Sequence, residues 1–260
     1  MCARCGDTLG APLLASSPAS AALCRSCRMA PPPFVRAVAF GPYQDRMKTA
    51  IHALKYDRLH RAARGLGQML ADAIAQLAPE APVEMLVVPV PLHRAKYSDR
   101  GFNQARSLAV HALAFLRKSH PWWRLTLASS TLMRLRETGS QAGLTPRQRR
   151  LNVRGAFSVS DPSEVDSRHI LLIDDIFTTG ATARAAAQAL VRAGAASVWV
   201  ATLARARRIN TPQLWEFQRR SEFENAEDDQ GSCVQGSYGN LAAATVRPES
   251  IYSSQDQPSF

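Results

Sequence analysis

Residues 170–182 of the chain read ILLIDDIFTTGAT. The four leading apolar residues, bounded by a turn, predict a strand covered on both faces, as in a parallel sheet. Asp174 and Asp175 follow, and an alanine-rich helix is expected over residues 183–192. Residues 178–182 then form a helix start, where backbone N–H groups lack intrahelical partners and favour an anion. Because ionised carboxylates only accept hydrogen bonds, the two aspartates suit sugar hydroxyls or Mg²⁺, and the loop suits a ribose 5-phosphate.

This segment resembles the signature of type I phosphoribosyltransferases, which bind phosphoribosyl pyrophosphate. The family pattern is an apolar strand, two acidic residues, a short spacer and Thr-Gly-x-Thr, all of which are present here. The resemblance implies that Asp174 and Asp175 are catalytic and hold magnesium with the ligand. An ordinary Asp-rich turn with a threonine cap would explain the strand and the cap, but not the full ordered set. The residues expected to bind the phosphoribosyl group in the turn are Thr178, Thr179, Gly180, Ala181 and Thr182.

Strands alternating with helices predict an α/β fold, a mostly parallel twisted sheet flanked by helices. Residues 134–152 are polar, basic and rich in turn-forming residues, which predicts a long loop. Ligands of such folds bind beyond the carboxyl ends of the strands, where Asp174 and Asp175 fall. Strands are expected at residues 35–40, 85–91 and 197–203, with a weaker pattern at 125–132, and residues 155–159 are expected as a strand that returns to the same sheet. Helices are expected at residues 45–56, 64–77, 104–115 and 182–193.

The chain divides into three predicted parts. Residues 1–30 form a small four-cysteine module, which a stiff Ala-Pro-Pro-Pro linker closes. Residues 34–206 form the phosphoribosyltransferase-like domain. Residues 207–260 lose the periodicity and become polar and acidic, which predicts a disordered tail.

Two cysteine pairs, Cys2/Cys5 and Cys24/Cys27, each have C-x-x-C spacing and are separated by 18 residues. This spacing is typical of a four-thiolate zinc site in a zinc-ribbon-like module. A segment this short cannot build its own core, so a structural Zn²⁺ would supply most of its folding energy. The alternatives are unligated thiols or a redox pair at Cys24 and Cys27.

The composition bounds the location and the partners of the protein. The 260 residues are 46% hydrophobic, yet no apolar run reaches membrane-spanning length, so no membrane insertion is expected. The first residues resemble no secretory segment, which favours a cytoplasmic location. The net charge is +11, and residues 93–154 hold 13 Lys or Arg against two acids. This basic centre suggests polyanionic partners, although a solvated charged face is an equal alternative.

Two further segments point to a particular family among the phosphoribosyltransferase-like proteins. Residues 88–104 read VPVPLHRAKYSDRGFNQ and residues 135–157 read LRETGSQAGLTPRQRRLNVRGAF. With the cysteine pairs and the Asp-Asp signature, they resemble the ComF/GntX family, which is associated with bacterial competence for DNA uptake. The resemblance spans residues 2–206 and leaves the tail without a counterpart.

The resemblance implies roles for the basic residues of these segments. The loop after the first sheet strand, residues 91–96, would contact the pyrophosphate, with Arg94, Lys96 and Arg100 as its cations. Within the following turn, Gly101 permits a tight bend and Asn103 can cap the next helix. The predicted loop at 134–152 would cover the ligand and neutralise the leaving group or bind nucleic acid, through Arg136, Arg147, Arg149 and Arg150.

Two functions stay open for this sequence. One is a phosphoribosyltransferase that displaces pyrophosphate from ribose C1 and hands phosphoribose to an acceptor. The other is a protein without catalysis that keeps the phosphoribosyl pyrophosphate site and handles single-stranded DNA, with a competence helicase or other uptake proteins as further candidate partners. Aromatic side chains among the basic residues could stack on bases, although packing explains the two tryptophans better. His93 is either a titrating group or a structural hydrogen-bonding one. The aromatic residues concerned are Tyr97, Phe102, Trp122 and Trp123.

Overall fold

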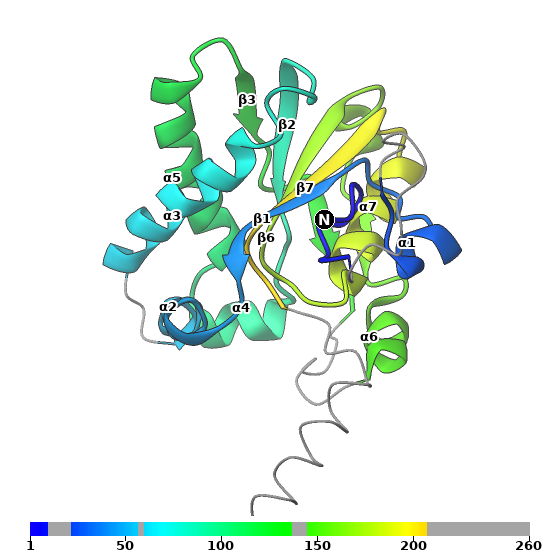
Figure 1. Cartoon of the computed structure of the whole chain (residues 1–260), viewed down its shortest axis with the longest axis horizontal. Helices are drawn as coiled ribbons and strands as arrows, with labels where there is room; N and C mark the ends of the chain where they lie inside the picture. The colour runs from blue at the N-terminus through cyan, green and yellow to red at the C-terminus, as the bar shows by residue number, and fades with distance from the viewer. Residues whose placement is uncertain (10–21, 57–59, 137–144, 207–260) are drawn as a thin grey trace, which may run out of the picture. The chain divides into compact units, whose positions relative to one another are not determined.

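The computed structural model of the protein describes residues 1–9, 22–56, 60–136 and 145–206. The tail predicted at residues 207–260 lies outside this part of the chain. None of the described helices is long and apolar enough to cross a membrane. The elements are, in chain order (Figure 1), α1 (Arg25–Met29), β1 (Ala37–Pro42), α2 (Asp45–Tyr56), α3 (His60–Ala75), β2 (Glu84–Pro89), α4 (Arg94–Arg100), α5 (Gln104–Ser119), β3 (Arg124–Leu127), β4 (Leu132–Arg134), α6 (Pro146–Val153), β5 (Phe157–Val159), a 3-10 turn (Pro162–Glu164), β6 (His169–Phe177), α7 (Ala181–Arg192) and β7 (Ser197–Arg205).

Five of the strands form one sheet in the order β1-β7-β6-β2-β3. Every neighbouring pair in this sheet is parallel, and β6 lies at its centre, with Leu171 opposite both Val87 of β2 and Trp199 of β7. The predicted α/β fold with a parallel sheet is therefore confirmed.

Helices cover both faces of the sheet, as the apolar signature strand predicts. Along β6, Ile170 and Leu172 pack on the side of α7, whereas Leu171 and Ile173 pack on the side of α3 and α5. Figure 1 shows α3 and α5 on one side of the sheet and α7 with the N-terminal module on the other. All four side chains are fully buried, and burying each contributes about 1.5–3 kcal/mol. This core fixes the strand whose end carries the aspartates.

The strand expected at residues 155–159 does not return to the main sheet. β5 instead pairs antiparallel with β4 in a separate two-stranded sheet, with Leu132 opposite Val159 and Arg134 opposite Phe157. The weak pattern at residues 125–132 accordingly divides between β3 and β4. The expected return of this strand to the main sheet was wrong, because a short apolar run indicates a strand but does not identify the strand beside it.

The long loop predicted at residues 134–152 was also wrong in part. Residues 146–153 form α6, while residues 137–144 lie outside the described chain. A capping box starts the helix: the Thr145 hydroxyl accepts the N–H of Gln148, and the Gln148 side chain accepts the N–H of Thr145. Pro146 occupies the first turn, where its missing N–H costs nothing. These local signals outweigh the polar composition that suggested a loop.

The order of the strands locates a crevice in the sheet. From β2 the chain moves outward to β3, and from β6 it moves outward to β7 in the opposite direction. The adjacent strands β2 and β6 therefore form a topological switch point. In open parallel sheets, ligands bind in the crevice beyond the carboxyl ends of such strands. The two loops that leave these ends are the ones that carry the predicted site.

Candidate functional site

The aspartate pair lies at the switch point. β6 continues through Asp174 and Asp175 to Phe177, past the strand end expected after Ile173. Its pairing with β2 stops at Ile173, whereas its pairing with β7 continues to Phe177. Both carboxylates are half-buried and lie beyond the last β2 pair, beside the loop that follows β2. The pair therefore lies at the edge of the sheet where open parallel sheets bind ligands.

A cation that the sequence did not suggest lies near this pair. Arg134, the last residue of β4, is partly buried, and its guanidinium carbon lies 5.4 Å from the centre of the Phe157 ring. Burial lowers the pKa of Arg134, while the charge of Asp174 acts in the opposite direction. Arginine stays protonated in proteins, so Arg134 places a fixed positive charge near Asp174. Oδ1 of Asp174 also accepts the N–H of Asp175 at 2.9 Å.

The predicted phosphate turn connects β6 to α7. The helix begins at Ala181, one to two residues before the expected start at 182 or 183, and its N-cap is Gly180 in the left-handed region with φ 74°. The hydroxyl of Thr179 accepts the N–H of Ala181 at 3.3 Å. A glycine cap supplies no side-chain acceptor to the first turn. A start of this kind on a 12-residue helix is suited to an anion, because backbone donors and the helix dipole both favour negative charge.

The loop after β2 is tied to the start of α5 by one side chain. Asn103 is the N-cap of α5: its Oδ1 accepts the N–H of Arg106 at 3.2 Å, while its Nδ2 donates to the carbonyl of Val90 at 3.0 Å. The expected capping role is confirmed, and the second bond additionally holds the loop at the switch point. Gly101 ends α4 with φ 74°, which confirms the tight bend.

The predicted pyrophosphate cations lie on a short helix. The expected loop at residues 91–96 ends early because α4 begins at Arg94. His93 caps this helix, with its Nδ1 accepting a backbone N–H of the first turn at 3.4 Å, which supports the structural interpretation of this histidine. Lys96 and Arg100 are one helical turn apart and partly buried, so they share a face. Arg94 is exposed on a different face.

The arginines predicted to bind nucleic acid divide into two groups. Arg136 donates from Nη2 to the carbonyls of Asn152 at 3.1 Å and Arg154 at 2.9 Å, so it holds the chain around the end of α6. The other three belong to α6, and their side chains are not among those described; they are Arg147, Arg149 and Arg150.

The two tryptophans lie at the opposite edge of the sheet from the aspartates. They directly precede β3, and the strands are parallel, so both are at the amino edge. Trp123 is buried and donates its indole N–H to the carbonyl of Pro82 at 2.8 Å. Trp122 is half exposed and stacks on it, with ring centres 5.9 Å apart. Packing therefore explains Trp123, and neither ring can share a site with the Asp174 turn.

The four predicted metal ligands come together. The Sγ atoms of the two cysteine pairs all lie within 4.8 Å of one another, and the Cys5 and Cys24 sulfurs are 3.6 Å apart. In a tetrahedral site with Zn–S bonds of about 2.3 Å, neighbouring sulfurs are about 3.8 Å apart. The cluster is therefore compatible with a metal such as zinc. Cys24 is half-buried, and the fully buried members are Cys2, Cys5 and Cys27.

The surroundings shift the pKa values of the cysteine thiols in different directions. Burial by itself raises the pKa of Cys2, but backbone N–H groups of Cys24, Cys5 and Arg4 outweigh it and lower that pKa to about 6. Burial raises the pKa of Cys27 and, in spite of the charge of Arg205, also that of Cys5. Metal ligation requires thiolates, so a bound cation would have to offset this burial.

Comparison with known proteins agrees with this geometry. A family model described as the phosphoribosyl transferase domain matches residues 105–237. The DNA utilization protein YhgH of Salmonella typhi is 33% identical over 79% of this chain and 84% of its own length. The chain belongs to the ComF family of phosphoribosyl transferase domains. Other members of this family are the competence protein F of Haemophilus influenzae, 27% identical over 70% of the chain and 78% of that protein, and the competence protein ComFC of Bacillus subtilis, 30% identical over 63% and 61%.

Two arginines of this ComF-family chain were missed as parts of the site. Arg134, at the end of β4, interacts electrostatically with Asp174, and Arg205 contacts the cysteine cluster from the end of β7. Both follow apolar residues at the end of a strand, and a charged residue in that position was the available signal. Their partners are distant in sequence, so only the fold identifies the contacts.

Proposed function

We propose that the chain binds phosphoribosyl pyrophosphate with magnesium in the crevice at the carboxyl ends of β2 and β6. The observation that carries this proposal is the placement of Asp174, Asp175 and the start of α7 at the topological switch point. The carboxylates and the helix start are adjacent there, as a phosphorylated sugar requires.

Each part of the site has a role suited to its chemistry. The turn at residues 178–182 receives the 5-phosphate on backbone N–H groups. Asp174 and Asp175 accept hydrogen bonds from the ribose hydroxyls and can hold Mg²⁺, a hard cation that prefers oxygen ligands. Lys96 and Arg100, on one face of α4, and the exposed Arg94 supply positive charge for the pyrophosphate.

A transfer reaction at this site would break the bond between ribose C1 and the pyrophosphate oxygen. The bond electrons leave with pyrophosphate, and the acceptor forms the new bond to C1. Bound Mg²⁺ would supply charge neutralisation of the leaving group. The basic side chains of α4 and the nearby Arg134 would add fixed positive charge at the developing anion.

The four cysteines are proposed to hold a structural Zn²⁺. The burial of three thiols and the 3.6 Å sulfur separation support this assignment. A residue set made only of thiolates selects zinc over magnesium or calcium. Elemental analysis should then find one zinc per chain, and none after replacement of all four cysteines by serine.

The names of the relatives support a link to DNA. The Salmonella protein is named for DNA utilization, and the Haemophilus and Bacillus proteins for competence. These names support a role in DNA uptake. We further propose a cytoplasmic location, with single-stranded DNA and a competence helicase or other uptake proteins as partners. The alternative to a transferase is a protein that keeps the phosphoribosyl pyrophosphate site and handles single-stranded DNA without catalysis.

Calorimetric titration with phosphoribosyl pyrophosphate and Mg²⁺ tests the proposed ligand. Wild type is expected to bind, and Asp174→Asn/Asp175→Asn to bind at least about 100-fold more weakly, because two ligand oxygens lose their charge. Asp72→Asn, which changes an exposed carboxylate on α3, is the matched control and should bind as wild type does. Absence of binding to wild type, or equal binding by the double variant, would exclude the site.

Measuring pyrophosphate release separates the two candidate functions. A transferase should release pyrophosphate when the correct acceptor is supplied, with the loss of release in Asp174→Asn/Asp175→Asn. Binding without release across nucleobases, amines and single-stranded DNA supports the DNA-handling protein instead.

A further inference from the structure

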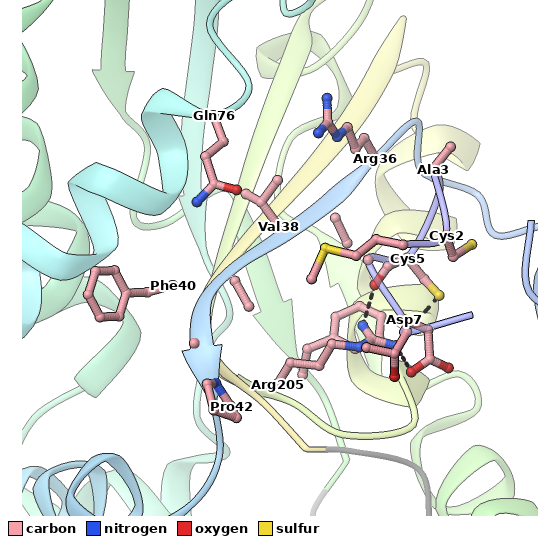
Figure 2. Close-up of a pocket in the computed structure, with 17 residues that line it drawn as sticks. Cys2, Ala3, Cys5, Asp7, Arg36, Val38, Phe40, Pro42, Gln76 and Arg205 are labelled. Atoms are coloured by element: carbon pink, nitrogen blue, oxygen red, sulfur yellow. Dashed lines mark hydrogen bonds and ion pairs between the residues drawn. The ribbon is translucent and has the colours of Figure 1, made fainter. Parts of the chain in front are cut away.

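Arg205 lies beside Cys5 and Asp7 (Figure 2) and also contacts Phe177, the residue that precedes the turn at residues 178–182. It is the last residue of β7, and only 12% of its side chain is exposed. Its Nη1 donates to the carbonyl of Cys5, and its Nη2 lies 3.5 Å from both the Cys5 sulfur and Oδ1 of Asp7. One guanidinium therefore contacts a predicted metal ligand in two places and a nearby carboxylate.

The same guanidinium touches the turn through one aromatic ring. Its central carbon lies 4.6 Å from the ring centre of Phe177, the last residue of β6. This ring packs against Gly180 so closely that a Cβ at position 180 would lie 2.5 Å from it. The Phe34 ring packs against the Phe177 ring in a T-shaped arrangement, with centres 6.1 Å apart. A continuous series of contacts thus runs from Cys5 through Arg205 and Phe177 to the N-cap of α7.

The charge of the metal site explains why the contacts of Arg205 should depend on the metal. Four thiolates around Zn²⁺ carry a net charge of −2, which a buried guanidinium beside Cys5 and its N–H···S contact would help to balance. When the metal leaves, the ligation that fixes the position of Cys5 is lost, and the two contacts of Arg205 with Cys5 lose that support. Arg205 then keeps Asp7 as its anionic partner.

A cavity leaves room for Arg205 to move. It has a volume of about 380 Å³ and is lined by the first residues of the chain, by β1, and by Phe177 and Arg205. Figure 2 shows Arg205, Cys5 and Asp7 together on one side of it, and Arg36 away from them. The lining of the cavity includes Phe177 but neither of the two aspartates and none of residues 178–182, so the cavity is separate from the proposed ligand site.

We propose that Arg205 is a positioning residue that couples metal occupancy of the four-cysteine site to the order of the turn at residues 178–182. Metal at the cysteines holds Arg205 against Phe177, and Phe177 holds Gly180 in its left-handed conformation. The inference rests on the proposed function in one respect: ordering this turn strengthens binding of phosphoribosyl pyrophosphate.

Hydrogen–deuterium exchange on zinc-loaded and chelator-treated protein tests the coupling. In wild type, zinc removal should accelerate exchange at residues 178–182 by about 5- to 150-fold, the usual range of coupling between two sites. In Arg205→Gln the same treatment should change the exchange rate of residues 178–182 by no more than about twofold, because the guanidinium that contacts both Cys5 and Phe177 is absent. Arg36→Gln, an arginine on the same cavity that pairs with Glu80 instead, should behave as wild type.

Zinc affinity provides a second measurement. Competition with a chromophoric chelator should show that Arg205→Gln binds zinc about 10- to 100-fold more weakly, as for other residues that support metal ligands. Arg205→Lys keeps the charge and should restore part of the zinc affinity, but not the exchange effect, since lysine lacks the planar group that reaches Cys5 and Phe177 together. Equal zinc-dependent exchange in wild type and Arg205→Gln would overturn the proposal.

Phe177→Leu keeps the test decisive if Arg205→Gln does not fold. It removes the ring that Arg205 contacts but keeps the polar contacts of Arg205 with Cys5 and Asp7, so zinc affinity should stay at the wild-type value while the zinc effect on the turn is lost. A full zinc effect in this variant would also overturn the proposal. Exchange and zinc affinity are measured without phosphoribosyl pyrophosphate. A wild-type protein that fails to bind this ligand would therefore contradict the proposed function but not the coupling.

Discussion

Position 180 sets two conditions that only glycine meets. Its φ of 74° is in the left-handed region, and the ring of Phe177 occupies the space where a side chain would begin. The turn can therefore reverse within a few residues and bring the start of α7 beside the aspartates. The Thr-Gly-x-Thr signature thus has a steric cause that can be measured on the folded chain.

Gly180→Ala is expected to destabilise the protein more than Gly101→Ala does. Both glycines have φ 74°, so alanine costs about 1–2 kcal/mol at either position. Only Gly180 faces a ring, which adds about 1–3 kcal/mol of overpacking, because the space beside Gly101 is open. Urea unfolding of the two variants measures the difference. Equal losses of unfolding free energy would show that the Phe177 contact does not constrain the turn.

Among the elements, α5 has a role beyond covering the sheet. Its N-cap Asn103 also holds the carbonyl of Val90, so the helix start and the loop after β2 are fixed by one amide. Since that loop forms one wall of the crevice, a capping residue becomes part of the support of the site.

Asn103→Ala should therefore weaken ligand binding as well as stability. Loss of the cap is expected to cost about 1 kcal/mol of unfolding free energy. Loss of the bond to Val90 should weaken binding of phosphoribosyl pyrophosphate by about tenfold, or ~1.4 kcal/mol. Asp161→Ala removes the cap of the exposed 3-10 turn and serves as the control, because it should leave this affinity unchanged. An unchanged affinity in Asn103→Ala would limit this residue to helix capping.

The elements also show which features the sequence could predict. The signature strand, the turn and the following helix are contiguous, so their order and chemistry could be predicted from one segment. The Thr145 capping box was equally local and was present in the sequence, although residues 146–153 were expected in a loop. The pairing of β5 with β4 depends on a strand that is distant along the chain. The partners of Arg134 and Arg205 are also distant along the chain, so the periodicity of the sequence could not predict these contacts.

For the molecule as a whole, the distribution of charge matters most for DNA. The basic residues of the central segment do not form a single site. Arg94, Lys96 and Arg100 lie on α4, which follows the carboxyl end of β2. Other basic residues lie near the amino edge of the sheet, around the end of α5 and the start of β3. The effect of neutralising basic residues on DNA affinity should therefore depend on the end of the sheet at which they lie.

Neutralising α6 should affect single-stranded DNA more than neutralising the amino edge. Arg147→Gln/Arg149→Gln/Arg150→Gln removes three charges that the family resemblance assigns to an anionic partner. It should lower the dependence of log affinity on log salt by about 2, at ~0.7 per lost phosphate contact. The control Arg117→Gln/Lys118→Gln/Arg124→Gln removes three exposed charges at the opposite edge. Titration of a labelled oligonucleotide at several salt concentrations measures both slopes. Equal slopes for the two triple variants would exclude α6 as the specific contact.

A crystal structure of the protein with phosphoribosyl pyrophosphate and Mg²⁺ tests the proposed site most directly. The 5-phosphate should lie on the backbone N–H groups of residues 178–182, with the ribose hydroxyls beside Asp174 and Asp175. The pyrophosphate should point toward the loop after β2 and α4. A ligand bound away from the carboxyl ends of β2 and β6 would exclude this site.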